Sequence, residues 1–234
     1  MPPKPTKAAP DADAPLQRYR ARRDFARTPE PGGAVRGTRR DADAPLSFVV
    51  QKHWASRLHY DFRLEWGGVM LSWAVPKGPS LDPRVKSLAI RVEDHPLDYN
   101  RFEGTIPKGQ YGAGAVIVWD RGRWEPLGDA DAGLAQGKLA FRLYGEKLGG
   151  LWELVRTSRP DDTKRNQWLL LKKRGDAWAR PAQEYDVISA LPDSVIAHPL
   201  APEAALPARL APQLATAVAS APAGGPWIVE TKFD

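Results

Sequence analysis

The sequence predicts a mainly β protein, an antiparallel β-barrel of about eight strands with short flanking helices. Between Leu46 and about Val195, short runs of alternating apolar and polar residues follow one another. Turns rich in glycine and proline separate these runs, and the region has little helical periodicity. Many short strands with short connections are typical of a closed or nearly closed antiparallel barrel.

Each element of the barrel follows from this pattern. Turns are expected at Gly67-Gly68, Pro76–Pro79, Asp120-Arg121-Gly122 and Lys147–Gly150. The nine tryptophans are suited to filling the inward face. The candidate strands are residues 47–53, 57–66, 70–75, 87–93, 115–120, 138–143, 151–156 and 168–173.

The segments around the barrel differ in composition. Residues 1–15 are rich in proline and alanine and are expected to be a disordered tail. Residues 16–27 predict a short helix that ends before Pro29, and residues 32–45 a polar loop. The barrel domain with its N-terminal arm is expected at 16–195, an Ala/Pro-rich linker at 196–226, and the truncated start of a second domain at 227–234.

Composition restricts the functional classes. The chain of 234 residues carries a formal net charge of +6, which favours an anionic partner, most commonly nucleic acid. Arginines concentrate in the N-terminal arm between Leu16 and Arg40. The absence of cysteine excludes disulfides, thiolate zinc sites and cysteine nucleophiles. No stretch resembles a signal peptide or a membrane span, so the expected location is the cytoplasm, or the nucleoid if DNA is the partner.

A run of strict alternation from Leu58 to Glu65 contains the most informative side chains. In a strand, His59, Asp61 and Arg63 would share one face, and His53, six residues upstream of His59, has the same parity. Imidazole beside carboxylate suits a divalent metal such as Mn, Fe or Zn, and a guanidinium can grip a phosphate with two hydrogen bonds. This pattern indicates phosphate chemistry. The alternative is a half-buried strand whose polar face is simply solvated.

Two further segments bear on the site. His95 falls where a strand ends, at which point an imidazole can bind metal, hold phosphate or protonate a leaving oxygen; the alternative is a capping or core histidine. Residues 101–118 form a glycine-rich segment with a lysine but do not match the phosphate-binding loop pattern. We interpret this segment as a wide hairpin loop that lines the site.

Taken together, several motifs resemble the 3′-phosphoesterase domain of bacterial DNA ligase D, over roughly residues 16–194. The central motif is His53-x5-His59-x-Asp61-x-Arg63, with His95-Pro96-Leu97-Asp98-Tyr99 downstream. The other matching segments are Arg23-Asp24-Phe25-x-x-Thr28-x-Glu30-Pro31, Phe48-Val49-Val50-Gln51-Lys52-His53, Trp73-Ala74-Val75-Pro76-Lys77-Gly78, and Gly104-x-Ile106-Pro107-x-Gly109-x-Tyr111-Gly112.

The resemblance implies a hydrolase that remodels DNA 3′ ends in non-homologous end joining. It implies a Mn²⁺-dependent 3′-phosphodiesterase and 3′-phosphomonoesterase that removes a terminal ribonucleoside and then the 3′-phosphate, leaving a 3′-OH. Other divalent transition metals remain alternatives. Its partners would be primer-template 3′ ends, including ribonucleotide-terminated ends, a Ku-type end-binding protein, and polymerase and ligase domains of the same parent chain.

The resemblance also implies residue roles. His53, His59 and Asp61 would hold the metal. Arg63, His95 and Tyr99 would act at the reacting phosphate. The expected phosphate-binding and substrate-binding residues are Arg23, Asp24, Glu30, Gln51 and Lys77. At the C-terminal end, Lys232-Phe233-Asp234 resembles the start of the lysine motif of an ATP-dependent ligase domain.

Two rival functions stay open at this stage. His59 and Asp61 with a distant His95 also fit the two-histidine, one-carboxylate triad of non-haem iron oxygenases, although that reading leaves His53 without a role. The second rival is a non-catalytic module that binds DNA ends and in which the histidines are structural.

Overall fold

The computed structural model describes residues 14–33, 45–157 and 166–200. The predicted tail, linker and second-domain start lie mostly or wholly outside these residues. The strands are β1 Leu46–Trp54, β2 Leu58–Trp66, β3 Val69–Val75, β4 Lys86–Arg91, β5 Gly104–Ile106, β6 Gly114–Pro126, β7 Lys138–Gly145, β8 Gly149–Arg156 and β9 Gln167–Lys172. The helices are η1 Ala14–Leu16, α1 Gln17–Ala21, η2 Leu97–Arg101, α2 Ala130–Gln136 and α3 Val187–Ala190.

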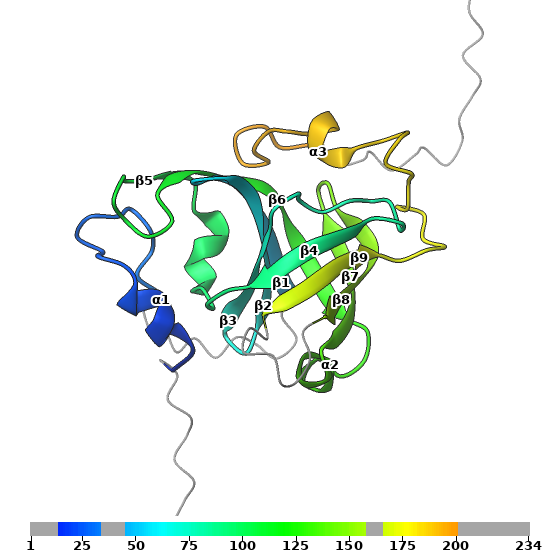
Figure 1. Ribbon diagram of the computed structural model, residues 1–234, viewed down its shortest axis with the longest axis horizontal. Coiled ribbons are helices and arrows are strands. Elements are labelled where there is room, and N and C mark those ends of the chain that lie inside the picture. The colour runs from blue at the N-terminus through cyan, green and yellow to red at the C-terminus, as the bar shows by residue number, and fades with distance from the viewer. Residues whose placement is uncertain (1–13, 34–44, 158–165, 201–234) are drawn as a thin grey trace, which may run out of the picture. The chain divides into compact units, whose positions relative to one another are not determined.

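Eight of the nine strands close into an antiparallel barrel (Figure 1). The sheet order is β1-β2-β3-β4-β9-β8-β7-β6-β5, and β1 also pairs with β6. β5 pairs with the first residues of β6 and adds a short extension on the side of α1. The predicted barrel of about eight strands is therefore confirmed.

The barrel interior holds the main core. Phe62, Trp73, Trp119, Phe141 and Trp152 are fully buried there. Trp124 and Trp168 join the same core, so inward packing is confirmed for five of the nine tryptophans. Fully burying one large apolar side chain contributes about 1.5–3 kcal/mol, so this cluster makes the barrel a firm support for side chains on its outer face.

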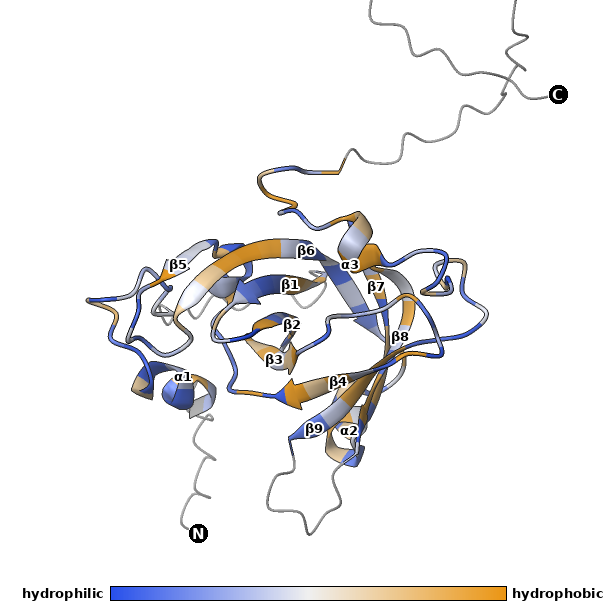
Figure 2. Ribbon diagram, turned by 45° about the horizontal axis from the view of Figure 1, so that its top comes forward, coloured by the Kyte–Doolittle hydropathy of each residue, from blue (hydrophilic) through white to orange (hydrophobic). Residues whose placement is uncertain are grey.

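A second, smaller apolar cluster lies outside the barrel wall. Tyr19 from α1, Tyr99 and Phe102 from around η2, Ile106 from β5 and Val116 from β6 are all buried together. β6 carries its hydrophobic residues in its first half and becomes hydrophilic afterwards (Figure 2). The cluster anchors the N-terminal arm and η2 against the sheet and so covers the outer face of β1 and β2.

One predicted turn is wrong. Residues 120–122 lie inside β6, which continues to Pro126 and pairs with β7 beyond this point. Gly122 lies opposite Gly145, and a Cβ added at Gly122 would come within 2.1 Å of the Tyr144 carbonyl oxygen. Glycine is needed at this position because two backbones approach closely, not because the chain reverses.

The helices also differ from prediction. The segment expected to be helical over 16–27 ends at Ala21, after which the chain turns at Asp24, whose carboxylate accepts a hydrogen bond from Ala26 N at 3.1 Å. The short helices α2 and α3 were not located from the sequence. They lie at opposite ends of the barrel in Figure 1.

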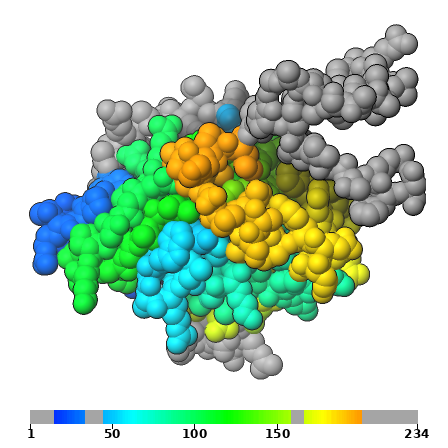
Figure 3. Space-filling view, turned by 90° about the horizontal axis from the view of Figure 1, so that it is seen from above, coloured from blue at the N-terminus to red at the C-terminus, as the bar shows by residue number. Residues whose placement is uncertain are grey.

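The end of the described chain packs on the barrel. Val195 N donates to Val118 O at 2.9 Å, and Trp119 Nε1 donates to Leu191 O at 2.7 Å. Figure 3 shows this segment, coloured orange, over the barrel end near the cyan β1–β2 hairpin. In the parts of the chain that the structure describes, no helix has the length and apolar character needed to span a membrane.

Candidate metal centre and phosphate pocket

The outer face of β1 and β2 carries the polar residues singled out in the sequence. The two strands pair with His53 opposite His59 and Gln51 opposite Asp61. Because opposite residues in an antiparallel pair share a face, all four side chains project to the same side as Arg63. Asp61 and Arg63 are buried at 7% and 2% exposure, so the alternative of a solvated polar face is wrong. The covering N-terminal arm and η2 account for this burial.

His53, His59 and Asp61 form a group that could bind a metal ion. One ligand atom from each lies within 4.8 Å of the others. His53 Nε2 donates to Gly112 O at 2.8 Å, and His59 Nδ1 donates to Arg57 O at 3.0 Å. Such bonds fix the orientation of a ligating imidazole and leave the other ring nitrogen as the lone-pair donor.

The remaining ring nitrogens face the carboxylate. His53 Nδ1 lies 3.4 Å from Asp61 Oδ2, and His59 Nε2 lies 3.7 Å from Asp61 Oδ1. All of these atoms are acceptors in neutral histidine and ionised aspartate, so a proton or a cation must lie among them to make the arrangement favourable. The donor set of two imidazoles and one carboxylate fits a divalent transition metal.

The charge state of the group follows from its neighbours. Burial alone would raise the pKa of Asp61, but Arg63 and the two histidines outweigh burial and hold this pKa well below its usual range. Burial would likewise lower the pKa of His59, yet its hydrogen bond with Asp61 and the charge of that carboxylate raise it. The Asp61 carboxylate is therefore ionised over the whole physiological pH range.

The Arg63 guanidinium is fixed by an ion pair and two hydrogen bonds to three neighbouring side chains. Its Nη2 lies 3.2 Å from Asp61 Oδ2, its Nε donates to Gln51 Oε1 at 2.9 Å, and its Nη1 donates to Ser72 Oγ at 2.8 Å. Gln51 in turn donates to the carbonyl oxygens of Tyr99 and Phe102. This network fixes the guanidinium beside the metal group, and it gives Gln51 a positioning role.

His95 lies between two arginines. Its Nδ1 is 2.9 Å from Arg63 Nη1 and 2.9 Å from the Glu93 carbonyl oxygen, and its Nε2 is 3.4 Å from Arg23 Nη2. Burial and the charges of Arg63 and Arg23 hold the pKa of His95 well below its usual range, so the imidazole is neutral near pH 7. An isolated antiparallel bridge to Met70 fixes its backbone.

The N-terminal arm delivers Arg23 to the same pocket. Arg23 Nε donates to Glu30 Oε1 at 2.8 Å, and Nη1 lies 3.3 Å from Glu93 Oε1. Tyr99 also donates to Glu30 Oε1, at 2.8 Å. Burial and the neighbouring Glu30 carboxylate raise the pKa of Tyr99 well above its usual range, so its hydroxyl stays protonated.

These groups line one pocket of about 270 Å³. Its walls include the metal group and also Arg23, Arg63, His95 and Tyr99. Tyr111 and Gly112, from the glycine-rich segment between β5 and β6, line it as well, which confirms that this hairpin loop borders the site. The pocket therefore combines a metal-binding group with two guanidinium groups and one neutral imidazole.

Two predicted site residues lie elsewhere. Asp24 is exposed and its carboxylate bonds within its own turn. Lys77 is exposed beyond the end of β3 and borders a different hollow with Pro76, Gly78 and Asp186. Asp24 directly follows Arg23, and Lys77 lies three residues beyond Ala74, but of these four residues only Arg23 and Ala74 line the pocket.

Three residues with evident roles were not assigned from the sequence. Glu93 binds both Arg22 and Arg23 through its carboxylate. Ser72 supports Arg63, and Tyr111 stands at the pocket rim. Glu93 lies two residues before His95, and this spacing is the one feature of the sequence that could have identified Glu93. Ser72 lies in a predicted strand for which only the apolar residues were considered.

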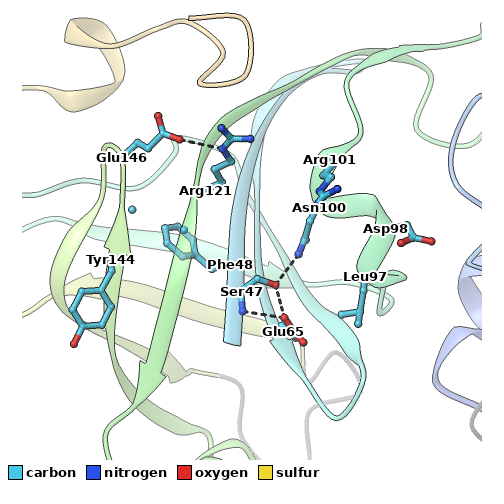
Figure 4. A pocket seen from close by; sticks show the side chains of 12 residues that line it. Ser47, Phe48, Glu65, Leu97, Asp98, Asn100, Arg101, Arg121, Tyr144 and Glu146 are labelled. Carbon is cyan, nitrogen blue, oxygen red and sulfur yellow. Dashed lines mark hydrogen bonds and ion pairs between the residues drawn. The ribbon is translucent and has the colours of Figure 1, made fainter. Parts of the chain in front are cut away.

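A larger hollow of about 940 Å³ lies elsewhere on the barrel and is not this site. It is bordered by Ser47, Glu65, Asn100 and Arg121 (Figure 4). Asn100 Nδ2 donates to Ser47 Oγ at 2.9 Å, and Arg121 Nε pairs with Glu146 Oε1 at 3.1 Å. None of the described residues that border it is a histidine.

Comparison with known proteins agrees with this site. Residues 51–156 match the family described as the DNA ligase D 3′-phosphoesterase domain. The chain is 50% identical over 241 aligned residues to the multifunctional non-homologous end joining protein LigD of Pseudomonas aeruginosa, an alignment covering 94% of this chain and 28% of that protein. LigD of Mycobacterium tuberculosis is 46% identical over 63% of this chain and 20% of its own length.

LigD of Mycolicibacterium smegmatis is 39% identical over 73% of this chain and 23% of its own length. The chain thus spans less than a third of the length of these curated relatives. The matched residues include the end of β1 and all of β2, β3 and η2, and with them His53, His59, Asp61, Arg63 and His95. The chain therefore belongs to the DNA ligase D 3′-phosphoesterase domain family.

Proposed function

We propose that this protein is a metal-dependent phosphoesterase that trims DNA 3′ ends for end joining. It removes a terminal ribonucleoside and then hydrolyses the remaining 3′-phosphate, leaving a 3′-OH. The observation that carries the proposal is the approach of two imidazole nitrogens to the carboxylate of Asp61, at 3.4 and 3.7 Å, beside the guanidinium of Arg63.

The metal ligands are His53, His59 and Asp61, and the physiological ion is Mn²⁺. When bound, this ion supplies charge that offsets phosphate oxygens and lowers the pKa of a water molecule. Three protein ligands suit a catalytic centre because they leave positions for water and substrate. The mixed nitrogen and oxygen donor set is compatible with Mn²⁺.

Arg63 and Arg23 bind the phosphate that enters the pocket. Each guanidinium is held by a carboxylate or an amide on one side, so its orientation is fixed before substrate arrives. Fixed donors aimed at developing charge contribute on the order of a few kcal/mol each to the lowering of the barrier. Glu30 and Gln51 are positioning residues in this proposal, and Asp24 and Lys77 stay predicted substrate contacts outside the pocket.

His95 is the candidate proton donor to the leaving oxygen, provided that substrate binding first raises its pKa. It is neutral in the free protein because Arg23 and Arg63 repel its positive form. A dianionic phosphate between the two arginines offsets their charge, which raises the pKa of His95 when substrate binds. Tyr99, with a raised pKa and its hydroxyl committed to Glu30, orients Arg63 and His95 rather than transferring a proton.

The geometry weighs against the oxygenase alternative. That reading used His59, Asp61 and His95 as ligands and left His53 without a task, whereas the candidate metal group among the described residues comprises His53, His59 and Asp61. His95 does not belong to this group and instead lies beside two guanidinium groups.

The proposal extends to the partners of the domain. The substrate is a primer-template end, and the relatives' names place LigD in non-homologous end joining. We further propose that the domain acts with a Ku-type end-binding protein and with polymerase and ligase domains of one parent chain, in the cytoplasm at the nucleoid.

The test is a gel assay with a 5′-labelled primer-template whose primer ends in one ribonucleotide. With Mn²⁺ we expect two successive products, the first ending in a 3′-phosphate and the second, one phosphate lighter, in a 3′-OH. Without a divalent ion, and with His59→Ala or Asp61→Ala, we expect neither product. Arg23→Ala and Arg63→Ala should raise the KM for the 3′-phosphate substrate.

The control is Asp98→Asn, at an exposed acidic residue in the larger hollow, which should behave as wild type. A wild-type protein that binds the primer-template but never cleaves it would support the rival function of a non-catalytic end-binding module. Turnover that needs iron and oxygen would support the oxygenase.

A further inference from the structure

The pocket has a charged floor and one aromatic group at its rim. Arg63, Asp61 and His95 are buried, and the other lining groups, Tyr111 excepted, are buried or half-buried. Among the described residues that line the pocket, Tyr111 alone is exposed, at 45%. A phosphate bound at the floor must therefore extend its attached nucleoside past Tyr111 toward solvent.

Tyr111 is held in place by the N-terminal arm. Arg22 Nη1 donates to the Tyr111 hydroxyl at 2.7 Å and to Glu93 Oε2 at 2.9 Å. The guanidinium carbons of Arg22 and Arg23 lie 4.9 and 5.4 Å from the centroid of the Tyr111 ring. The ring thus belongs to a loop between β5 and β6 but is oriented by contacts from a different part of the chain.

Holding the Tyr111 ring in one orientation costs conformational entropy, and the folding of the loop does not require this orientation. An exposed aromatic ring on a loop gains little from burial, and Gly109 and Gly112 on either side have φ of +86° and +76°. Fixing the ring by a charge-assisted hydrogen bond pre-orders it in the orientation it has at the rim. Pre-ordered aromatic rings beside phosphate-binding groups are suited to stacking on nucleobases.

We propose, on the basis of the proposed function, that Tyr111 is the binding residue for the base of the 3′-terminal nucleotide. The base stacks on the Tyr111 ring while its 3′-phosphate lies between Arg63 and Arg23. Stacking uses the face of a base, which all four bases have, so Tyr111 confers affinity for a terminal nucleoside without selecting its identity. Arg22 acts through Tyr111 and is a positioning residue.

The chain offers a matched control in Tyr144. Its ring is 38% exposed, the guanidinium carbon of Arg123 lies 4.5 Å from its centroid, and its hydroxyl donates to Glu125 at 2.8 Å. Tyr144 borders the larger hollow (Figure 4) and does not line the pocket of the metal group. It reproduces the exposure and local contacts of Tyr111 at a position that the terminal base does not reach.

The experiment is photocross-linking of the full chain to a primer-template whose primer ends in 5-iodouridine 3′-phosphate. The reaction is run in EDTA, so that the end is not processed. We expect a cross-linked peptide that contains Tyr111 in wild type and in Tyr144→Ala. Tyr111→Ala should lose at least about 10-fold of the cross-linked yield, and Tyr111→Phe, which keeps the ring, should retain most of it.

Kinetics supply a second readout. Tyr111→Ala should raise KM about 10-fold for a primer ending in a nucleoside 3′-phosphate and leave kcat within about 2-fold, whereas an abasic 3′-phosphate end should be insensitive to the substitution. An unchanged cross-link in Tyr111→Ala, or an equal loss on abasic ends, would overturn the inference.

The two proposals fail separately. A Tyr111 cross-link without any 3′-end hydrolysis refutes the proposed enzyme while supporting the base platform. Normal hydrolysis with a cross-link at another residue refutes the platform and leaves the proposed enzyme intact.

Discussion

At the scale of single residues, the site is defined by where ring nitrogens point. His53 and His59 each donate one N–H to a backbone carbonyl, so that their other nitrogens face Asp61. His95 differs because it faces two guanidinium groups. These surroundings support our proposal that the imidazole is a metal ligand at two positions and a neutral phosphate-pocket group at the third.

These surroundings predict opposite pH behaviour for two histidines. In the metal-free protein, the pKa of His59 is raised by Asp61, so its titration midpoint should lie above its usual value. His95, with a pKa held well below its usual range by burial and by Arg63 and Arg23, should show no titration around pH 6.5, the usual pKa of a histidine. The chain has only four histidines, so their Cε1–H resonances can be followed individually by NMR.

Adding Zn²⁺ should abolish the titration of His59, because metal and proton compete for the same nitrogen. A His95→Gln variant identifies the silent resonance. A His95 signal that titrates near pH 6.5 in the free protein would refute the assigned electrostatics, as would a His59 signal unaffected by the metal.

At the scale of elements, the β1–β2 hairpin positions the three proposed metal ligands, and η2 covers the outer face of this hairpin. The residues of this hairpin that form the metal group could be predicted from the sequence because strand parity alone determines which side chains share a face. Arg23 could be assigned only by resemblance, because its place depends on a contact 70 residues away in sequence, with Glu93. Asp24 and Lys77 are exposed and do not line the pocket of the metal group, so their assignment as substrate-binding residues stays a prediction that rests on the resemblance alone.

Gln51 links these two elements and predicts a kinetic defect. Gln51→Met removes the acceptor for Arg63 Nε and the donors to Tyr99 O and Phe102 O. A guanidinium displaced by about 1 Å can cost on the order of 100-fold in kcat/KM, whereas metal affinity should change little since Gln51 is not a ligand. Steady-state kinetics and calorimetric Mn²⁺ titration separate the two effects.

The matched control is Lys52→Met, one residue along β1 and on the other face of the strand. It should leave kcat/KM within about 2-fold, as surface changes usually do. Equal loss of activity in both variants would mean that strand stability, rather than the position of Arg63, limits turnover.

The connection between β7 and β8 depends on one carboxylate. Asp120 is fully buried and accepts backbone hydrogen bonds from Arg121, Glu146, Lys147 and Leu148, at 2.9 Å each. Asp120→Asn turns an amide donor toward at least one of these N–H groups. The free energy of unfolding should fall by about 1–3 kcal/mol in urea denaturation, against almost no change for the exposed Asp98→Asn. An Asp120→Asn variant as stable as wild type would contradict this role.

At the scale of the whole molecule, the barrel was predictable and the site's enclosure was not. Alternating runs and turn residues were enough to predict a closed sheet. The small apolar cluster that holds the arm and η2 over the site joins residues as distant as Tyr19 and Val116. No local sequence pattern indicates such a contact. The burial of Asp61 and Arg63 could therefore not be predicted, and the alternative of a solvated polar face stayed open at the level of the sequence.

The charge of the whole chain predicts how it binds DNA. With a net charge of +6 and exposed arginines such as Arg18, Arg22 and Arg27 on the arm, affinity for a primer-template should fall by at least about 10-fold between 50 and 200 mM salt. His59→Ala and Asp61→Ala should keep this affinity and its salt slope, because backbone contacts dominate binding. Fluorescence anisotropy measures both, and an affinity that does not depend on salt would contradict the prediction.

The most direct test of the shared metal site is electron spin-echo spectroscopy of bound Mn²⁺. In wild type the account predicts couplings from two imidazole nitrogens to a single ion, and from only one in His53→Ala and in His59→Ala. A spectrum without nitrogen coupling in wild type, or with two nitrogens in either variant, would contradict the claim that His53 and His59 share one ion with Asp61.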